Sequence, residues 1–375
     1  GKDLFLRGIQ RYLRKYAHGL VETSDLIRTM EDSTGRNLHR FFDQWVFRAG
    51  HPILKVNITE LPEDKQLKIR VRQENKEPFV FPLQIRISYE KGAPDHRKIQ
   101  VEAKDQTFYL ERRDIPRTIE IDPEGVVLKD MQLRGPENLL RAQLEFGTTA
   151  KSRMDAAEAL GQLGAASANI KALDRTLNSA SQYRSVRVAA ARALGKITTS
   201  DSCRALIKGL EADEARARRA ASAALGGCES PDPVDHLKNR VKRDPSVHVV
   251  AAALESLGKF DDRSARSLLE KSLSRKSWNE TVASGAARGI AATEASWAPG
   301  VLLNHLGKGR TPKKVKVTIL RSLASYPTAD PTMEKKILKG VRNAAKNKDS
   351  FVVREALRTL TRIGSAEDFG TLEEG

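Results

Sequence analysis

The residues best suited to metal or acid–base chemistry are the histidines, and their spacing argues against a metal site. They lie at His18, His39, His51, His96, His236, His248 and His305, and no two are three or four residues apart. A His-Glu-x-x-His pair, a Gly-x-Ser-x-Gly elbow, a Walker loop and a dinucleotide-binding fingerprint are absent from the sequence. We therefore assign no catalytic residue, no metal ligand and no cofactor to this chain.

Arginines that recur in a repeated helical segment are the remaining candidates. Two residues before the closing apolar residue of each segment, the column reads Glu158, Arg192, Ala223, Glu255, Arg288, Arg321 and Arg358. This position points about 200° away from the closing residue around a helix, so we expect an exposed inner face. Its four arginines could bind a peptide carboxylate, an acidic protein or nucleic acid phosphates. Two glutamates interrupt the column and no aromatic residues alternate with it for base stacking. A solvated helix face is therefore the favoured interpretation, and nucleic acid is the less favoured partner.

A second set of cations stands seven residues before the closing residue, at Arg153, Arg187, Arg218 and Lys316. Seven residues make about two helical turns, so these side chains point to the same side as the closing residue. We expect them to form hydrogen bonds between neighbouring repeats, which is a structural role.

These positions belong to a repeat that starts at Pro136. Its closing residues are Leu160, Leu194, Leu225, Leu257, Ile290, Leu323 and Leu360, with successive spacings of 34, 31, 32, 33, 33 and 37 residues. A second amphipathic segment precedes most of them, and small alanines fill the packed face. Two helices per repeat at this period predict an α-solenoid over residues 135–375. The helices resemble HEAT-type repeats, whose Val-Arg-x-x-Ala-x-x-Ala-Leu pattern is matched from Val186 to Leu194.

The chain before the repeat changes its hydrophobic period at Pro52. Residues 1–50 carry apolar residues at helical spacing and predict three helices, of which the last contains Phe41 and Trp45 and runs to Ala49. Residues 52–129 alternate between apolar and polar positions, which predicts a small antiparallel β-sandwich over residues 51–134. The predicted fold is thus multidomain: a short all-α segment, a small antiparallel β-sandwich and an α-α superhelix. Exposed Phe41 and Trp45 would need a cover, so we expect the helices to pack on another part of the protein.

Composition and charge agree with a helical array. The net charge is +17, and the excess of basic residues is 3 over residues 1–50, 1 over residues 51–134 and 13 over residues 135–375. Cys203 and Cys228 lack paired-ligand spacing, and we interpret both as ordinary packing residues rather than as a disulfide of a secreted domain. No apolar run approaches the ~18 residues that a membrane helix needs, so no membrane partner is expected. The compartment is left open, with the cytoplasm slightly favoured.

The first 58 residues resemble a known family. They contain Phe5…Gly8-Ile9…Tyr12-Leu13, then Thr23-x-Asp25-Leu26, then Gly35…Phe41-Phe42-x-Gln44-Trp45…Gly50-x-Pro52…Val56. This order closely resembles the aminopeptidase N-like zinc peptidases, which are gluzincins. The resemblance implies that residues 1–50 end a thermolysin-like catalytic domain, that 51–134 form the β-sandwich, and that 135–375 form the HEAT-like solenoid. The family's Gly-x-Met-Glu-Asn loop, zinc motif and catalytic tyrosine have no counterpart here. Zinc is therefore expected in a full-length parent and not in this chain.

Two functions follow from these observations. In the first, the chain is the carboxy-terminal non-catalytic portion of a zinc aminopeptidase-like protein, caps the active-site cavity and contacts peptide substrate. Its partners are then the peptide and the missing amino-terminal catalytic region. In the second, it is a non-catalytic HEAT-repeat scaffold for an acidic protein or a nucleic acid, since one relative in this family lost its zinc ligands. Arg192, Arg288, Arg321 and Arg358 are the candidate contacts in both cases.

Overall fold

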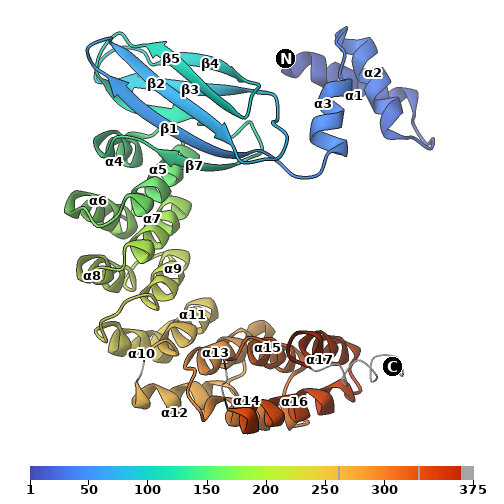
Figure 1. The fold of residues 1–375 in the computed structure, drawn as a ribbon, viewed down its shortest axis with the longest axis vertical. Helices are drawn as coiled ribbons and strands as arrows, with labels where there is room; N and C mark the ends of the chain where they lie inside the picture. Colours follow the sequence, from blue (N-terminus) through green and yellow to red (C-terminus); the bar gives the residue numbers. More distant parts are fainter. Residues whose placement is uncertain (261, 328–329, 365–375) are drawn as a thin grey trace. The chain divides into compact units, whose positions relative to one another are not determined.

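A computed structural model of the protein describes residues 1–260, 262–327 and 330–364. It confirms the predicted fold class, with short helices first, then two small sheets, then a long series of helices (Figure 1). Gly1–Pro116 and Ile121–Pro136 form one compact unit, and Arg117–Glu120 with the chain from Glu137 onward form a second. The division of the chain at residues 50 and 134 stays a prediction. Residues 365–375 of the predicted solenoid lie outside the described residues.

Three short helices open the first unit. They are α1 (Lys2–Lys15), α2 (Thr23–Thr34) and α3 (His39–Phe42), and α3 continues as a π-helix over Asp43–Phe47. A capping box begins α2, where the Asp25 carboxylate accepts a hydrogen bond of 3.0 Å from the backbone N–H of Glu22. The third helix ends at Phe47 rather than at Ala49, because Arg48 already has an extended backbone with ψ 131°.

Trp45 anchors this last helix to the sheets. Its ring centroid lies 5.6 Å from that of Phe79 and 6.4 Å from that of Phe81. The neighbouring Gln44 side chain donates to the backbone oxygen of Val80 at 2.9 Å and accepts from its N–H at 2.6 Å. The expectation that Trp45 is exposed is therefore wrong, because the aromatic residues of the sheets half-bury it. Phe41 is exposed as expected, at 54%.

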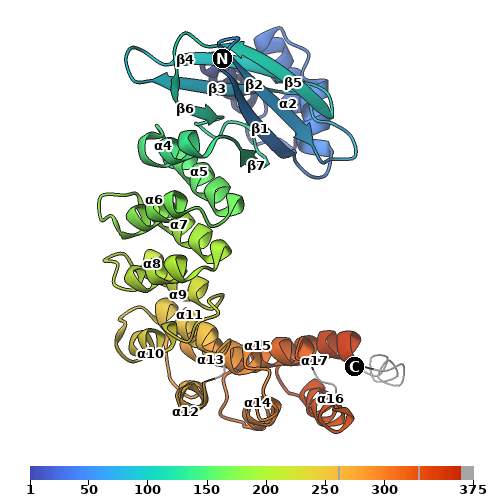
Figure 2. The same cartoon turned by 60° about the vertical axis from the view of Figure 1, so that its left-hand side comes forward.

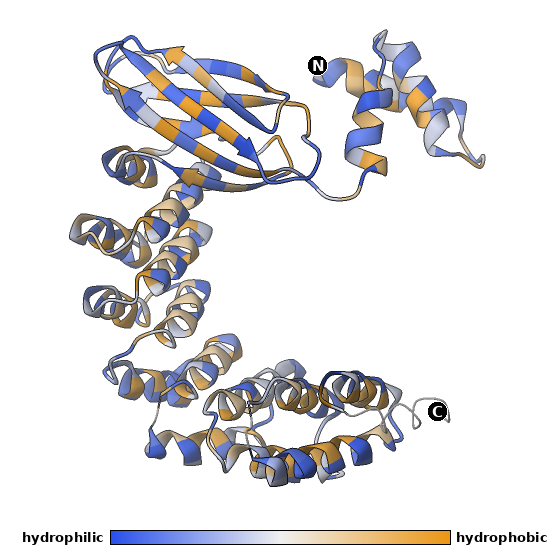
Figure 3. Ribbon diagram, viewed as in Figure 1, coloured by the Kyte–Doolittle hydropathy of each residue, from blue (hydrophilic) through white to orange (hydrophobic). Residues whose placement is uncertain are grey.

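Seven strands form two sheets, which belong to the first unit except for Arg117–Glu120 of the sixth strand. One sheet has the order β5-β2-β1-β7 and the other β4-β3-β6. Inward residues such as Val56, Ile69 and Ile85 are at most 1% exposed, and Figure 3 shows the alternation of hydrophobic and hydrophilic residues along the strands. One pairing departs from the antiparallel expectation, because β7 runs parallel to β1. The strands are β1 (Ile53–Leu61), β2 (Gln66–Gln73), β3 (Phe81–Tyr89), β4 (Asp95–Val101), β5 (Asp105–Glu111), β6 (Pro116–Ile121) and β7 (Asp130–Arg134).

The second unit is an array of paired helices. An inner row contains the odd-numbered helices α5 to α17, and an outer row contains the even-numbered helices α4 to α16 (Figure 2). The predicted closing residues all lie in the inner row and are at most 2% exposed, which confirms the repeat. The helices are α4 (Glu137–Phe146), α5 (Ala150–Leu163), α6 (Ser167–Asn178), α7 (Arg184–Ile197), α8 (Ser200–Gly209), α9 (Ala215–Leu225), α10 (Pro233–Arg243), α11 (Val247–Leu257), α12 (Arg263–Ser272), α13 (Thr281–Ala292), α14 (Ala298–Gly307), α15 (Lys313–Ala324), α16 (Pro331–Ala345) and α17 (Ser350–Ile363).

Small residues set the spacing of the inner row. Gly258 follows α11 and Gly289 lies in α13, and a Cβ on Gly258 would overlap the backbone oxygen of Gly289. Only glycine allows such a close approach of two backbones. The inner helices therefore pack backbone to backbone and leave their polar side chains to project from the row.

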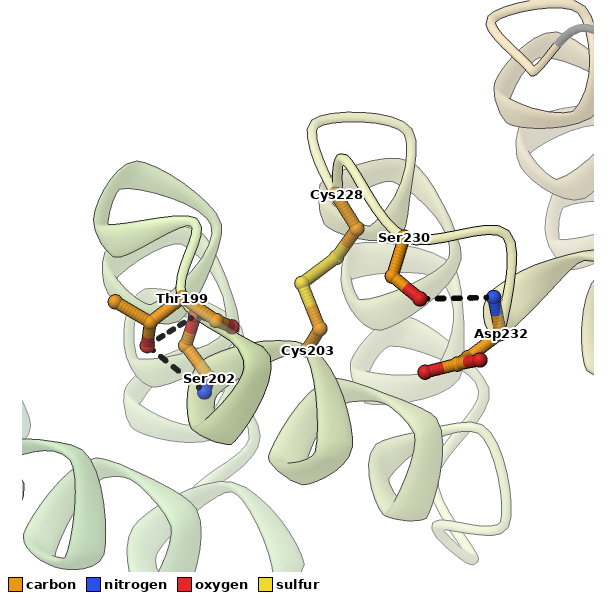
Figure 4. The surroundings of a disulfide bond; sticks show 6 residues. All are labelled: Thr199, Ser202, Cys203, Cys228, Ser230 and Asp232. Carbon is orange, nitrogen blue, oxygen red and sulfur yellow. Dashed lines mark hydrogen bonds between the residues drawn. A yellow bond between two sulfur atoms is a disulfide. The ribbon is translucent and has the colours of Figure 1, made fainter.

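A disulfide links the outer helix of one repeat to the segment that follows its inner helix. Cys203 in α8 is bonded to Cys228, which follows α9, and their Cα atoms are 6.1 Å apart (Figure 4). The interpretation of both cysteines as unpaired packing residues is therefore wrong. They are buried, at 6% and 8% exposure, but the packing of α8 against α9 brings their sulfur atoms together.

Candidate functional site

The buried cations form a ladder between neighbouring repeats, as predicted. The Arg187 guanidinium donates to the backbone oxygen of Leu177 at 2.9 Å and to the Asp213 carboxylate at 2.7 Å. Arg187 is only 2% exposed, so this cation serves the packing of the array. It is not available to a ligand.

Arg218 and Arg153 also form hydrogen bonds to the following repeat. Arg218 binds both carboxylate oxygens of Asp244, at 2.8 and 3.2 Å, and this hydrogen bonding raises the pKa of Arg218. Arg153 donates to the side-chain oxygen of Gln182 at 2.9 Å. The structural role predicted for Arg153, Arg187 and Arg218 is therefore confirmed.

The exposed column of arginines lies on the inner row, and two of its members are held by glutamates. Arg288 donates to Glu255 at 2.7 Å and Arg321 donates to Glu355 at 2.9 Å. The second hydrogen bond raises the pKa of Arg321 and lowers the pKa of Glu355. These guanidinium groups are therefore oriented by neighbouring helices rather than freely solvated.

Arg288 and Arg321 lie together at a groove on the inner row, which we call the Trp278 groove. It has a volume of about 500 Å³, and its walls come from α9, α11, α13, α15 and the 3₁₀ turn Trp278–Glu280. Its floor consists of small residues such as Ala251 and Ser284. The charged residues that line it are Arg219, Glu255, Lys259, Arg288, Lys314 and Arg321, so five cations face one carboxylate.

The structure does not bring Arg192 and Arg358 to the same place. Arg192 is exposed on α7, whereas the Trp278 groove begins at α9. Arg358 lines a separate hollow of about 510 Å³ with Arg354 of α17 and with Lys348, which precedes that helix. The four candidate arginines therefore share one helical position without forming one site.

Sequence reasoning missed several groove residues. Arg219, Lys259 and Lys314 stand outside the column, at positions that the repeat period alone does not mark as facing the same groove. His248 and Trp278 were missed as a pair, and their rings meet edge to face with centroids 6.1 Å apart. The available signal was a tryptophan in a loop directly before a helix of small residues.

The described residues offer no metal site and no membrane span. Within the ranges that the structure covers, no group of three or more His, Cys, Asp or Glu side chains could hold a metal ion. In the same ranges, no helix is long and apolar enough to cross a bilayer. Zinc ligands therefore have no candidate among these residues.

Comparisons with known proteins found sequence similarity in the helical array and in other parts of the chain. The family described as HEAT repeats matches residues 138–226 and 204–291. Tricorn protease-interacting factor F2 of Thermoplasma volcanium is 40% identical over 57 residues, which are 15% of this chain and 7% of that protein. Alanine/arginine aminopeptidase of Saccharomyces cerevisiae is 23% identical over 163 residues, which are 41% of this chain and 19% of that protein.

A solved structure extends the likeness in fold to nearly the whole chain. The crystal structure of Legionella pneumophila aminopeptidase A in complex with aspartic acid superposes with a TM-score of 0.60 at 13% identity. It covers 97% of this chain and 52% of that one, so the chain spans about half of the solved protein. The chain is therefore similar in sequence to aminopeptidases over part of its length, similar in fold to a solved aminopeptidase over nearly all of it, and contains HEAT-type repeats.

Proposed function

We propose that this chain is the non-catalytic carboxy-terminal portion of a zinc aminopeptidase-like protein. In this proposal its helical array caps the active-site cavity and contacts the peptide substrate. The observation that carries the proposal is the order of its parts, which follows the fold of an aminopeptidase over 97% of the chain. The sequence relatives named as aminopeptidases support the same conclusion.

The amino-terminal helices support a catalytic region as the first partner. Phe5, Phe41 and Phe47 are 54%, 54% and 60% exposed, and a hollow of about 260 Å³ opens among α1, α2 and α3. Large exposed apolar surfaces of this kind mark places where another protein surface packs. A catalytic domain that ends in these helices would cover them.

The zinc chemistry needs residues that this chain does not supply. A zinc-bound water serves as nucleophile in peptidases of this kind. The residues described here do not fit a zinc site, so we assign no step of peptide hydrolysis to them. Their role in the proposal is to bind and orient a peptide, and Arg192, Arg288, Arg321 and Arg358 are the candidates, because guanidinium groups bind carboxylates in a bidentate fashion.

The test is to measure zinc content and aminopeptidase activity of the full-length protein, with this chain alone as the control. Stoichiometric zinc and turnover in the full-length protein only would support the proposal. Arg288→Glu with Arg321→Glu in that protein should then raise KM for long peptides and leave an aminoacyl-nitroanilide unaffected. A full-length protein without zinc and without activity would contradict the proposal.

The alternative function is a HEAT-repeat scaffold that binds an acidic protein or a nucleic acid. The observation that favours it is the group of groove cations without acidic partners among the described residues, which are Arg219, Lys259 and Lys314. Nucleic acid binding predicts a steep loss of affinity with increasing salt. It also predicts that Arg288→Glu and Arg321→Glu weaken binding.

A further inference from the structure

Trp278 gives the groove an aromatic wall that folding does not require. The indole is 70% exposed, while the described core of the array consists mainly of alanine, leucine, valine and isoleucine side chains. It lies against the exposed ring of His248, and both rings line the groove. Exposed tryptophan beside a cavity is characteristic of binding sites, because the ring offers a large, rigid contact area.

The backbone that carries Trp278 is strained. Asn279 has φ 52° and ψ 30°, and Glu280 has φ 53° and ψ 29°, so two consecutive residues occupy the left-handed region that favours glycine. Two hydrogen bonds hold the turn: the Thr281 hydroxyl donates to the Trp278 oxygen at 2.8 Å, and the Val282 N–H donates to the Ser277 hydroxyl at 3.0 Å. This fixed turn keeps the indole beside the groove.

The groove cations that have no acidic partner in the part of the chain that the structure describes are spread along the groove. Arg219 lies on α9, Lys259 follows α11 and Lys314 lies on α15, and all three are exposed. Neighbouring helices pack with axes 8–10 Å apart, so the three charges are distributed over about 25–30 Å. One carboxylate cannot reach all of them, whereas an extended segment with several carboxylates can.

We propose that the Trp278 groove binds an extended acidic segment of a partner protein. An aromatic side chain of that segment packs on Trp278, and its carboxylates pair with Arg219, Lys259 and Lys314. An acidic peptide fits better than a nucleic acid, because Glu255 lies in the groove and the wall offers one exposed indole rather than a row of stacking rings. The inference goes beyond the proposed function, since it holds whether or not the full-length protein hydrolyses peptides.

The test is a fluorescence anisotropy titration of the whole chain with a labelled, carboxy-terminally amidated decapeptide, which spans about 33 Å when extended and has one phenylalanine near its centre among aspartates and glutamates. Arg219→Glu with Lys314→Glu should weaken binding by about tenfold or more, because the removed cations face the peptide carboxylates. Lys271→Glu with Lys336→Glu is the matched control. It makes the same change in net charge at exposed positions of the outer helices α12 and α16 and should weaken binding by less than about twofold.

Trp278→Ala tests the aromatic contact separately from the charges. It should weaken binding of the phenylalanine peptide by about threefold, and it should not change the affinity for a peptide with alanine in place of the phenylalanine. Circular dichroism at 222 nm checks that each variant keeps its helices. Equal loss of affinity in the groove variant and in the control variant would overturn the proposal. So would equal affinity of the unchanged protein for the acidic peptide and for a peptide with asparagine and glutamine in place of its acidic residues.

Two further probes distinguish other possible ligands of the groove from the proposed acidic segment. If only a peptide with a free carboxy terminus binds, the groove is a terminal-carboxylate site. That result overturns this proposal and leaves the proposed contact with a peptide substrate standing. If an oligothymidylate of similar length binds more tightly and displaces the acidic peptide, the partner is a nucleic acid and the proposal fails.

Discussion

Replacing Arg218 with methionine tests whether the buried cations hold the repeats together. Arg218 is 9% exposed and the Asp244 side chain is fully buried. Methionine keeps the apolar stem and removes the charge, which leaves Asp244 with the Ser246 N–H at 2.9 Å and Arg240 at 3.7 Å. Loss of one partner of a buried ion pair costs about 3–5 kcal/mol. Because Arg240 remains close, we expect the free energy of unfolding to fall by about 3 kcal/mol.

Arg187→Met is the matched control in the neighbouring repeat. Arg187 is as deeply buried as Arg218, but the side chain of its carboxylate partner Asp213 is 66% exposed, so water can solvate that charge once the arginine is gone. The main loss is the hydrogen bond to the backbone oxygen of Leu177. We expect a decrease of about 1 kcal/mol.

The measurement is urea unfolding followed by circular dichroism at 222 nm, with the free energy taken from the midpoint and slope. Adding Asp244→Asn to Arg218→Met should recover at least half of the loss, because a neutral amide needs no counter-charge. Equal losses for the two arginine variants, or no recovery in the double variant, would refute the idea that a buried, uncompensated carboxylate sets the cost.

Three further predictions concern packing, the disulfide and acid stability. Gly258→Ala should lower the free energy of unfolding by about 3 kcal/mol, because the added methyl group overlaps the facing backbone. Gly300→Ala, which meets open space in α14, should leave it unchanged or raise it by up to about 1 kcal/mol, and thermal denaturation compares the two. Cys203→Ser or a reducing agent should lower it by about 3.5 kcal/mol, the chain-entropy value for a separation of 25 residues, and the variant should no longer respond to reductant. The hydrogen bond from Arg321 lowers the pKa of Glu355 in the folded state, so its stabilisation is present above the pKa of an unfolded glutamate, about 4.3, and is lost as the pH falls through the lower folded value. Urea midpoints measured through this range should fall less with pH in Arg321→Met than in the unchanged protein.

The repeat was predictable because each copy carries the same physical requirement. A closing residue such as Leu194 must be buried in every repeat, and in four of the seven repeats a cation stands seven residues earlier. Both features recur at a constant spacing, so they are visible in one sequence. The ladder and the buried stripe could therefore be placed before the structure was known.

Features that depend on one tertiary contact were not predictable. Strand β7 was missed because only Leu133 of its five residues is buried, which gives no alternation. The Cys203–Cys228 bond was missed because the packing of α8 against α9, and not the sequence spacing, sets the distance between the sulfur atoms. Disulfides persist in oxidising compartments, so this bond weighs against the slight preference for the cytoplasm.

The arginines of the exposed column were also only partly predictable from the sequence. The position of Arg288 and Arg321 on an exposed face of the inner row followed from helical geometry. Their partners Glu255 and Glu355 lie 33 and 34 residues away, which is about one repeat, but the period does not show which side chains of adjacent repeats form hydrogen bonds. Trp278 lies in the connection between the two helices of one repeat, where the helical period does not apply.

Arg218 and Arg219 are adjacent on α9 and separate the two roles of the array's cations most sharply. Consecutive residues point about 100° apart around a helix, so one guanidinium enters the ladder and the other projects into the Trp278 groove. Arg218→Met should therefore lower the free energy of unfolding. Arg219→Glu should leave this free energy within about 0.5 kcal/mol of that of the unchanged protein and should weaken binding of the acidic peptide. If Arg219→Glu proved as destabilising as Arg218→Met, the groove cations would belong to the structural ladder, and their exposure would no longer argue for a ligand.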